Sequence, residues 1–224
     1  MSCHEHEEAN VKIVDEKIED YLEDLYGKRH EVVNEMEAEA QKSDFPIVGP
    51  LVGKLLYQLA RMIDAKRVFE MGSGFGYSAF WWALAMNNAG SASRGGEIFL
   101  TEKSETNRER GEAYLKRAGL LKFVKYQVGN ALNVIDKIAG EFDIIFIDIE
   151  KQQYPAALEK AVKRIRRGGL LVADNVLWSG KVSQEKGDAS TESIKEFNRR
   201  VFSMNELAAS IVPVRDGVMV AYKI

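Results

Sequence analysis

The stretch Val68-Phe-Glu70-Met-Gly72-Ser-Gly74-Phe-Gly76-Tyr-Ser78 decides the fold of this chain. A short apolar run ends in a carboxylate, passes three alternating glycines and continues into helix-forming residues. Glycines at this spacing let the backbone approach a ligand closely, and the helix start that follows offers free N–H groups. The stretch therefore predicts a strand, a ligand-binding turn and a helix.

The carboxylate of Glu70 bears on which ligand the turn binds. Gly74-Phe-Gly76-Tyr-Ser-Ala79 satisfies the G-x-G-x-x-G/A pattern of dinucleotide sites, in which a pyrophosphate meets the helix start. A carboxylate would repel a phosphate there, whereas it suits the cationic amino group and sulfonium of S-adenosylmethionine (SAM). A tight turn without any ligand is the third interpretation. The stretch favours SAM.

Composition and charge narrow the class of protein. The chain has 224 residues, 46% of them hydrophobic and 29% charged, which predicts a single globular domain over residues 1–224. A net charge of −3 gives no general attraction to nucleic acid or to an anionic membrane. No apolar run reaches the length of a membrane-spanning helix, and Met1–Asn10 is acidic, unlike a signal peptide.

Cysteine and histidine are scarce. Cys3 is the single cysteine, so no disulfide forms within the chain and a reducing, cytoplasmic location is expected. Cys3, His4 and His6 could chelate a metal, although they lie in a polar end of the chain. All three histidines precede the glycines, whereas a Ser-His-Asp hydrolase of the α/β type needs a late histidine, so that class is disfavoured.

The spacing of apolar residues divides the chain into two parts. Up to residue 64, apolar residues recur at steps of three and four and predict helices around 11–25, 32–40 and 51–62, which form an N-terminal helical cap. From residue 65, short apolar runs alternate with helical stretches, as in a parallel sheet covered on both faces. The expected strands are Arg67–Met71, Glu97–Thr101, Phe123–Val128, Phe142–Asp148 and Leu170–Asp174. The expected helices are Tyr77–Met86, Glu105–Ala118, Ala131–Ala139 and Pro155–Arg166.

The end of the chain breaks this alternation. Leu207–Val214 and Val218–Lys223 are strand-like and flank Asp216-Gly217, a strong signal for a tight hairpin. The last strand is therefore expected to run antiparallel to its neighbours. The predicted fold class for residues 65–224 is α/β, with a doubly wound, Rossmann-like, mostly parallel sheet of seven strands and an antiparallel last strand. This is the arrangement of class I methyltransferases.

Polar residues end several of the expected strands, at the edge where doubly wound sheets bind ligands. Glu102 ends the second strand, where a carboxylate would hold ribose hydroxyls or favour a helix N-terminus. Asp148, Asp174 and Asn175 supply hard oxygen ligands at adjacent strand ends. That set suits Mg²⁺, Mn²⁺ or Ca²⁺ rather than zinc. The alternative is that these residues cap a loop and a helix.

Lys151 lies three residues after Asp148, where a cation opposes the dipole of the helix that follows. A nearby metal would favour the neutral form of Lys151, which can accept a proton, whereas a solvated surface lysine is the plain alternative. Trp178 could cover a metal-bound ring or anchor its own loop. A basic cluster at the end of a predicted helix is interpreted as surface charge, with contact to RNA as the alternative. Its members are Lys160, Lys163, Arg164, Arg166 and Arg167.

Three motifs together make the chain similar to the cation-dependent O-methyltransferases of the catechol and caffeoyl-coenzyme A type. They are the stretch from Glu70 to Ser78, Phe146-Ile-Asp148-Ile-Glu-Lys151-Gln-Gln-Tyr154 and Ala173-Asp-Asn-Val-Leu-Trp-Ser-Gly180. The resemblance covers essentially the whole chain. It implies a SAM-dependent enzyme that is commonly a homodimer.

The resemblance also implies roles by position. Glu70 would hold the amino group of SAM, and the turn with Gly72, Ser73, Gly74, Gly76 and Ser78 would line its methionine end. Glu102 would bind the ribose, and Ala131 would contact the adenine region. Asp148, Asp174 and Asn175 match the metal ligands, Asp148 also borders the cofactor, and Lys151 matches the proposed catalytic base.

Three positions depart from the family pattern. Val48 replaces a threonine or serine near the cofactor, so its contact would be through the backbone. Glu150 replaces an aspartate that positions substrate, beside Trp178 on the substrate side. Arg215-Asp216-Gly217 replaces the commoner Gly-Asp-Gly. These departures bear on the substrate rather than on the chemistry.

The predicted activity is methyl transfer from SAM to one of two adjacent hydroxyls of a catechol-like small molecule, with a bound Mg²⁺, Mn²⁺ or Ca²⁺. Three other functions stay open. One is methylation of a hydroxylated base in tRNA, favoured if the basic cluster faces the pocket. The others are an NAD-dependent oxidoreductase and a cofactor-binding module without catalysis.

Overall fold

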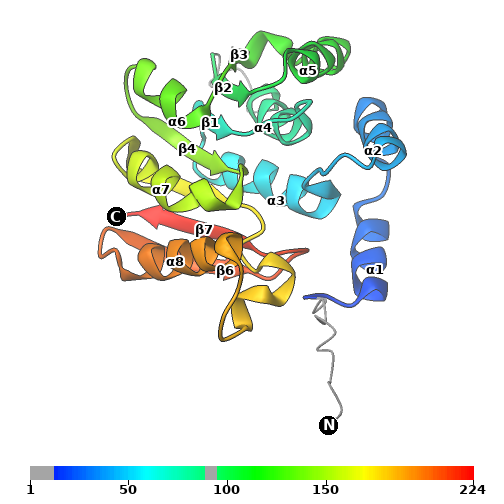
Figure 1. The fold of residues 1–224 in the computed structure, drawn as a ribbon. Coiled ribbons are helices and arrows are strands. Elements are labelled where there is room, and N and C mark those ends of the chain that lie inside the picture. Colours follow the sequence, from blue (N-terminus) through cyan, green and yellow to red (C-terminus); the bar gives the residue numbers. More distant parts are fainter. Residues whose placement is uncertain (1–12, 89–94) are drawn as a thin grey trace.

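The computed structural model describes residues 13–88 and 95–224. Cys3, His4 and His6, and the acidic stretch Met1–Asn10, lie outside the described residues. The described part is built around one seven-stranded sheet with helices on both faces (Figure 1).

The sheet has the strand order β3-β2-β1-β4-β5-β7-β6. Its strands are β1 (Arg67–Met71), β2 (Glu97–Glu102), β3 (Val124–Val128), β4 (Phe142–Ile147), β5 (Ile165–Ala173), β6 (Leu207–Val212) and β7 (Val218–Lys223). The first five strands pair in parallel, and β7 is antiparallel to both β5 and β6. The prediction of a doubly wound, mostly parallel sheet with an antiparallel last strand is confirmed.

Helices cover the two faces in two groups. The elements α2 (Glu31–Ser43), α3 (Gly49–Met62), α4 (Tyr77–Asn87) and α5 (Glu105–Arg117) contribute to one apolar core. The elements α6 (Ala131–Val134), α7 (Tyr154–Val162) and α8 (Ala189–Ser203) contribute to the other. The first helix, α1 (Glu16–Tyr26), has no buried residue and contacts α3.

Alternation along each central strand explains this layering. Val68 of β1 lies in the first core and the adjacent Phe69 lies in the second, because successive side chains point to opposite faces. Both are fully buried, which is why two large apolar residues follow one another in β1. The apolar helix α4 is buried nearly all round between the sheet and α3.

The structure corrects the bounds of several elements and adds one helix. The helix expected around 11–25 begins at Glu16, and the strand expected over Leu207–Val214 ends at Val212. The helix expected over Pro155–Arg166 ends at Val162, and β5 begins at Ile165 rather than at Leu170. The helix expected over Ala131–Ala139 ends at Val134 and continues only as a short 3₁₀ turn. The sequence interpretation missed α8. Its signal was an Asp188 N-cap and the buried residues Ile194, Phe197 and Val201 at helical spacing.

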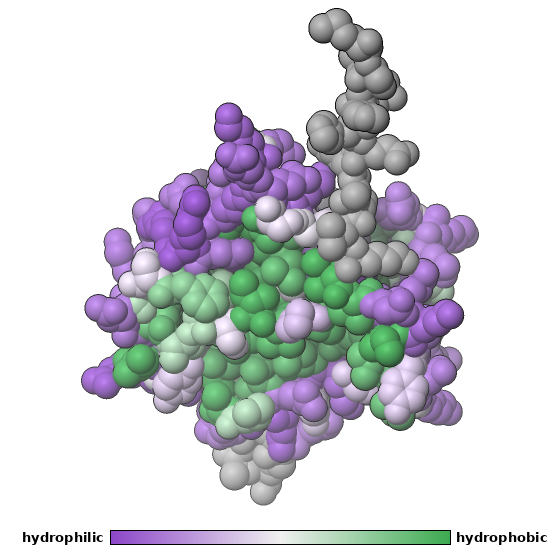
Figure 2. Space-filling model, turned by 90° about the horizontal axis from the view of Figure 1, so that it is seen from below, coloured by the Kyte–Doolittle hydropathy of each residue, from purple (hydrophilic) through white to green (hydrophobic). Residues whose placement is uncertain are grey.

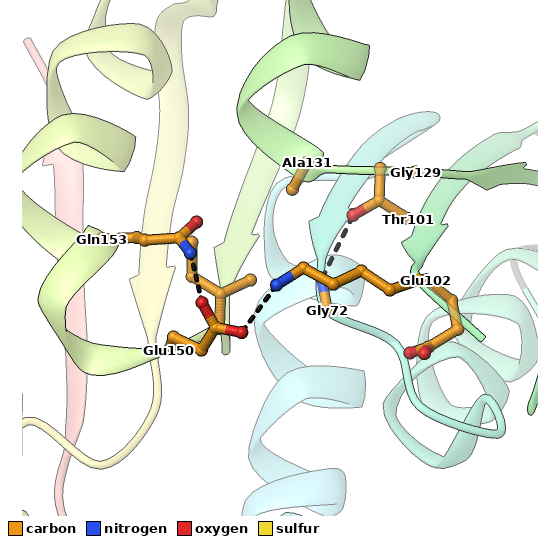
Figure 3. Close-up of a pocket in the computed structure, with 9 residues that line it drawn as sticks. Gly72, Thr101, Glu102, Gly129, Ala131, Glu150 and Gln153 are labelled. Atoms are coloured by element: carbon orange, nitrogen blue, oxygen red, sulfur yellow. Dashed lines mark hydrogen bonds and ion pairs between the residues drawn. The ribbon is translucent and has the colours of Figure 1, made fainter.

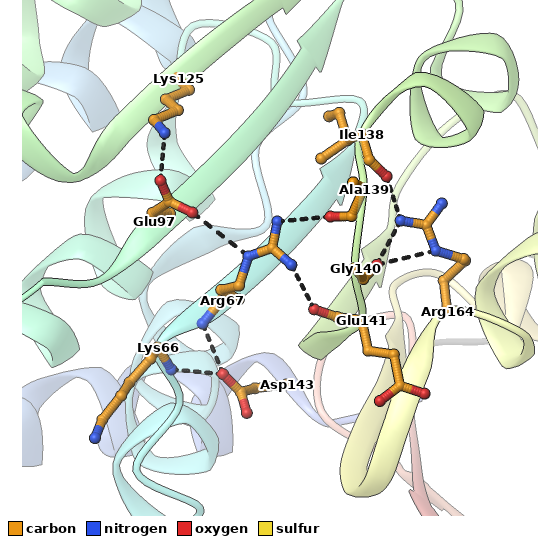
Figure 4. Close-up of polar contacts among 10 residues, drawn as sticks. All are labelled: Lys66, Arg67, Glu97, Lys125, Ile138, Ala139, Gly140, Glu141, Asp143 and Arg164. Carbon is orange, nitrogen blue, oxygen red and sulfur yellow. Dashed lines mark hydrogen bonds and ion pairs between the residues drawn. The ribbon is translucent and has the colours of Figure 1, made fainter.

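The early start of β5 places the basic cluster at the amino-terminal edge of the sheet. Phe142 of β4 pairs with Ile165, so Arg164 and Arg166 lie where these strands begin. Arg164 donates to the carbonyls of Ile135, Ile138 and Gly140, and Figure 4 shows part of this network around Arg67 and Asp143. Two further contacts of the basic cluster are the ion pairs of Arg166 with Asp143 and of Lys160 with Asp136. Arg164 and Arg166 therefore stabilise the sheet at the edge where β4 and β5 begin. This edge lies opposite the carboxyl ends of the strands.

Hydrophobic residues gather on the face of the molecule seen in Figure 2. Large apolar side chains that are exposed include Ile18 and Leu25 on α1, Met62 on α3 and Tyr222 on β7. No helix within residues 13–88 and 95–224 is both long and apolar enough to cross a membrane.

Candidate active site

A cavity of about 700 Å³ opens at the carboxyl ends of β1, β2, β4 and β5. One wall is the 45–48 segment between α2 and α3, and another is the glycine turn from Gly72 to Ser78. The cavity is also lined by charged and polar residues at or just after the strand ends: Glu102, Asp148, Lys151, Asp174 and Asn175. The residues predicted from three separate motifs therefore share one cavity.

Each glycine of the turn has its own packing reason. Gly72 has φ 83°, and a Cβ there would lie 2.1 Å from the carbonyl oxygen of Asp148. A Cβ on Gly74 would meet the ring of Phe45, and one on Gly76 would meet the hydroxyl of Tyr126. Gly72 and Gly74 line the cavity, whereas Gly76 is not among the lining residues. Close approach of backbone and side chains, not only of a ligand, requires these glycines.

Glu70 lies behind the glycine turn rather than on the cavity wall. Its side chain is fully buried and accepts hydrogen bonds from Ser78 Oγ at 2.5 Å and Trp82 Nε1 at 2.9 Å. Burial raises the pKa of Glu70 to about 8, although the hydrogen bond from Ser78 acts in the opposite direction. Ser78 lines the cavity, so Glu70 orients a residue that faces the ligand space.

Lys151 brings the oxygen donors of two strand ends together. Its side chain is only 9% exposed, and Nζ lies 3.1 Å from Asp148 Oδ1 and 2.8 Å from Asn175 Oδ1. Nζ also lies 2.7 Å from the hydroxyl of Tyr154. Burial raises the pKa of Tyr154 well above its usual value, so this hydroxyl is neutral and lies 2.8 Å from the Asp174 carbonyl oxygen. The sequence interpretation missed Tyr154 as a part of the site.

Asp174 has a buried carboxylate oxygen, Oδ1, that has no hydrogen-bond partner. Burial raises the pKa of Asp174, and the nearby charge of Asp148 raises it further. Within the described residues, no three side chains of His, Cys, Asp or Glu are grouped to hold a metal. The set formed by Asp148, Asp174 and Asn175 has two carboxylates and one amide. An unpartnered buried oxygen beside two more oxygen donors fits a hard divalent cation.

A smaller cavity of about 150 Å³ adjoins the first one and holds the positions predicted for ribose and adenine (Figure 3). Glu102 and Ala131 line it, with Gly72 at the junction of the two cavities. Glu102 is held by the Ser104 backbone N–H at 2.8 Å, so it faces the ligand space from a fixed position. Val48, on the opposite wall, lines only the larger cavity.

Glu150 and Trp178 both border more than one cavity. Glu150 pairs with Lys103 at 2.6 Å, and Figure 3 shows this ion pair beside Gln153. Trp178 lines the main cavity and a further space of about 490 Å³ that also touches Gln152 and Ser190. Trp178 has φ 48°, an uncommon backbone conformation for a large residue. The structure thus places Glu150 between the expected adenosine side and the expected substrate side.

The chain is similar to known methyltransferases over most of its length. The family model described as O-methyltransferase matches residues 23–224. A catechol O-methyltransferase from Niastella koreensis is 29% identical, over 88% of this chain and 90% of that protein. A caffeoyl-CoA O-methyltransferase from Petroselinum crispum is 29% identical, over 77% of this chain and 74% of that protein.

Solved structures agree with these relatives. An O-methyltransferase from Streptomyces achromogenes in complex with SAM has 26% identity and a TM-score of 0.82, covering 92% of this chain and 96% of that one. An O-methyltransferase from Bacillus cereus in complex with SAH also has 26% identity and a TM-score of 0.82, covering 93% of this chain and 97% of that one. The class I methyltransferase fold expected from the sequence is confirmed.

Proposed function

The chain belongs to the O-methyltransferase family, and we propose that it moves the methyl group of SAM to one of two adjacent hydroxyls on a small catechol-like molecule. The observation that carries this proposal is the meeting of Asp148, Asp174, Asn175 and Lys151 at one end of the main cavity. We also propose that residues 1–224 form a single methyltransferase domain, with residues 1–64 as its helical cap.

Asp148, Asp174 and Asn175 are the residues that would hold a divalent cation. The unpartnered Oδ1 atom of buried Asp174 supports this assignment, because a buried carboxylate oxygen without a partner is costly. A cation bound there supplies positive charge that lowers the pKa of an acceptor hydroxyl. Two vicinal hydroxyls satisfy such a site better than one, which is why we propose a catechol-like acceptor.

Lys151 holds and moves a proton in this proposal. Its Nζ contacts both Asp148 and Asn175, so a cation and an acceptor bound by these two residues would lie beside it. Neutral Nζ can take the proton of the acceptor hydroxyl, and solvent is the alternative acceptor. The chain's main contribution is to hold donor and acceptor in line.

The methyl donor would lie along the two adjoining cavities. Ser73 and Ser78 face its methionine end, and Val48 offers only an apolar side chain on the opposite wall. Glu102 is placed to accept from the ribose hydroxyls, and Ala131 leaves room for the adenine. Glu70 holds Ser78, and we propose that its carboxylate contributes to the binding of the donor's amino group mainly through that contact. Trp178 and Glu150 would border the acceptor.

The other functions have less support. Methylation of tRNA was favoured only if the basic cluster faced the pocket, yet Arg164 and Arg166 lie at the opposite edge of the sheet and are engaged in structural contacts. Membership of the O-methyltransferase family weighs against an NAD-dependent oxidoreductase. The shared cavity of cofactor and oxygen-donor residues weighs against a binding module without catalysis.

A transfer assay with methyl-labelled SAM tests the proposal. We expect label to enter catechols and flavonoids with adjacent hydroxyls, to enter matched monophenols at least tenfold more slowly, and to depend on added Mg²⁺ or Mn²⁺. Bulk tRNA is the competing substrate. Labelling of tRNA that falls steeply with salt, together with no turnover of any catechol, would overturn the proposed acceptor.

We further propose that the protein is a homodimer. The hydrophobic area that Figure 2 shows supports an apolar contact with a second copy. Light scattering after size-exclusion chromatography measures the mass directly, and a monomer at all accessible concentrations would contradict this proposal.

A further inference from the structure

The turn between β6 and β7, residues 213–217, lies against two walls of the main cavity. Met219 of β7 pairs with Ala173 at the end of β5, so the turn that precedes β7 lies at the carboxyl edge of the sheet. The sequence interpretation used Asp216-Gly217 only as a hairpin signal and noted Arg215 only as a departure from the family pattern.

The first wall is the 175–180 segment, and the turn holds its backbone. The Val176 N–H donates to the Gly217 carbonyl at 3.0 Å, and the Leu177 N–H donates to the Asp216 carbonyl at 2.9 Å. The Ser179 N–H donates to the Asp216 carboxylate. Gly217 has φ 80°, and a Cβ there would lie 2.4 Å from Leu177 Cγ. The segment and the turn are therefore packed too closely for a side chain at position 217.

The 175–180 segment has a strained backbone that contacts with other parts of the chain must hold in place. Asn175, Trp178 and Ser179 have φ values of 56°, 48° and 52°, a region that residues other than glycine rarely adopt. Such conformations cost about 1–3 kcal/mol each and persist where the surroundings enforce them. The hydrogen bonds from the turn supply part of that enforcement at the residues that carry Asn175 and Trp178.

Asp216 also bears on the place of the Asn175 side chain. Asn175 Oδ1 accepts from Lys151 Nζ at 2.8 Å, so the amide NH₂ group faces away from Lys151. The Asp216 carboxylate accepts from the Ser179 N–H, and the Asp216 carbonyl accepts from the Leu177 N–H. Asp216 thus holds the backbone of the segment that carries a proposed ligand.

The second wall is the 45–48 segment, and Arg215 holds it. Arg215 Nη1 donates to the Ile47 carbonyl at 3.0 Å across the chain. The guanidinium lies against Gly49, where a Cβ would be 2.1 Å from Nη1. Phe45, Ile47 and Val48 line the main cavity, so this hydrogen bond fixes the wall that faces the glycine turn.

We propose that the β6–β7 turn is a positioning element of the transfer site, with separate tasks for its two charged residues. Asp216 holds the backbone of the 175–180 segment, and with it the place of the Asn175 amide oxygen beside Lys151. Arg215 sets the place of the 45–48 wall, and with it the fit of the methyl donor. The inference rests on the proposed function in taking Asn175 as a metal ligand and the main cavity as the donor site.

The Asp216 task is tested by binding of Mn²⁺, followed by electron paramagnetic resonance without any acceptor. We expect Asp216→Asn to lower Mn²⁺ affinity by about 10- to 100-fold, the range seen when the partner of a metal ligand is removed. Asp216→Glu should recover part of that loss. The control is Asp20→Asn on exposed α1, which should bind Mn²⁺ as the wild type does. Unchanged affinity in Asp216→Asn overturns the Asp216 task.

The Arg215 task is tested by calorimetry with S-adenosylhomocysteine. We expect Arg215→Ala to raise the Kd for this ligand by about 3- to 10-fold while leaving Mn²⁺ affinity unchanged, with partial rescue in Arg215→Lys. The control is Arg199→Ala, an exposed arginine on α8. Equal Kd values in the two alanine variants overturn the Arg215 task. Absence of Mn²⁺ binding by the wild-type protein would instead contradict the proposed metal site, so the two failures are distinguishable.

Discussion

Lys151 Nζ donates a hydrogen bond of 2.8 Å to Asn175 Oδ1, joining the connection after β4 to the end of β5. The same nitrogen lies 3.1 Å from Asp148 Oδ1, so one ammonium spans two of the three oxygen donors proposed for a metal. Lys151 contacts the proposed metal ligands but is not a ligand itself, so it can be replaced by mutation while the ligands remain. Proton transfer and metal binding are therefore separable by mutation.

Lys151→Met should lower kcat by about 10²- to 10⁴-fold, the usual contribution of a positioned proton acceptor. Mn²⁺ binding should persist because Asp148 and Asn175 keep their oxygens. Lys163→Met, at an exposed lysine at the end of α7, serves as the control. A kcat within threefold of the wild-type value would assign the proton to solvent.

Removal of the metal should abolish turnover. EDTA is expected to stop the reaction, and Mg²⁺ or Mn²⁺ should restore it in the wild-type protein but not in Asp174→Ala. A metal at 100 times its Kd stabilises the folded state by about 2.7 kcal/mol, which raises Tm by roughly 5–10 °C in a chain of this size. Calorimetry should detect this rise in the wild type and not in the variant. Full activity after exhaustive chelation would show that the oxygen set is structural.

Glu70 should make stability depend on pH. Its folded pKa of about 8 lies above the usual 4.5, because burial disfavours the charged form. The folded state therefore holds a proton that the unfolded state releases, and the free energy of unfolding falls as pH rises from about 4.5 to about 8. Asp174, whose pKa is also raised, adds to this fall at lower pH. Urea unfolding of Glu70→Gln should show a flatter profile, and a profile equal to the wild type would refute the assignment.

Glu70→Ala should weaken binding of S-adenosylhomocysteine by roughly 0.5–1.5 kcal/mol, the scale of a hydrogen bond between neutral groups. The physical reason is that Ser78, which faces the cavity, loses the acceptor that orients it. Calorimetry measures the change, with Glu109→Ala on the exposed face of α5 as the control. Tight binding of NAD with no response to S-adenosylhomocysteine would contradict the cofactor assignment itself.

Arg164 and Arg167 should behave differently although they lie in one basic cluster. Arg164→Ala removes the donor to the carbonyls of Ile135, Ile138 and Gly140 and should destabilise the fold by about 1–3 kcal/mol in denaturant titrations. Arg167→Glu, at an exposed position, should leave both stability and catechol methylation unchanged. A large loss of activity in Arg167→Glu would point to a substrate contact at this edge.

Much of the fold could be predicted because local patterns dominate it. The bounds of β1 were predicted as observed, because a short apolar run followed directly by a glycine turn marks the end of a strand locally. The Asp216-Gly217 hairpin likewise predicted the antiparallel last strand. The start of β5 was predicted late because Arg166 and Arg167 interrupt its apolar run, and the partner of Arg166 becomes visible only when the fold brings Asp143 beside it.

The sequence by itself determined which residues end the strands, because glycine turns and apolar runs are local. It thereby predicted that Asp148, Asp174 and Asn175 lie at one edge of the sheet. Only the tertiary structure decided what surrounds them: the buried oxygen of Asp174, the hydroxyl of Tyr154, and the turn with Arg215 and Asp216. Burial, pKa and hydrogen-bond partners depend on segments far apart in the chain, and only the packed sheet brings those segments together.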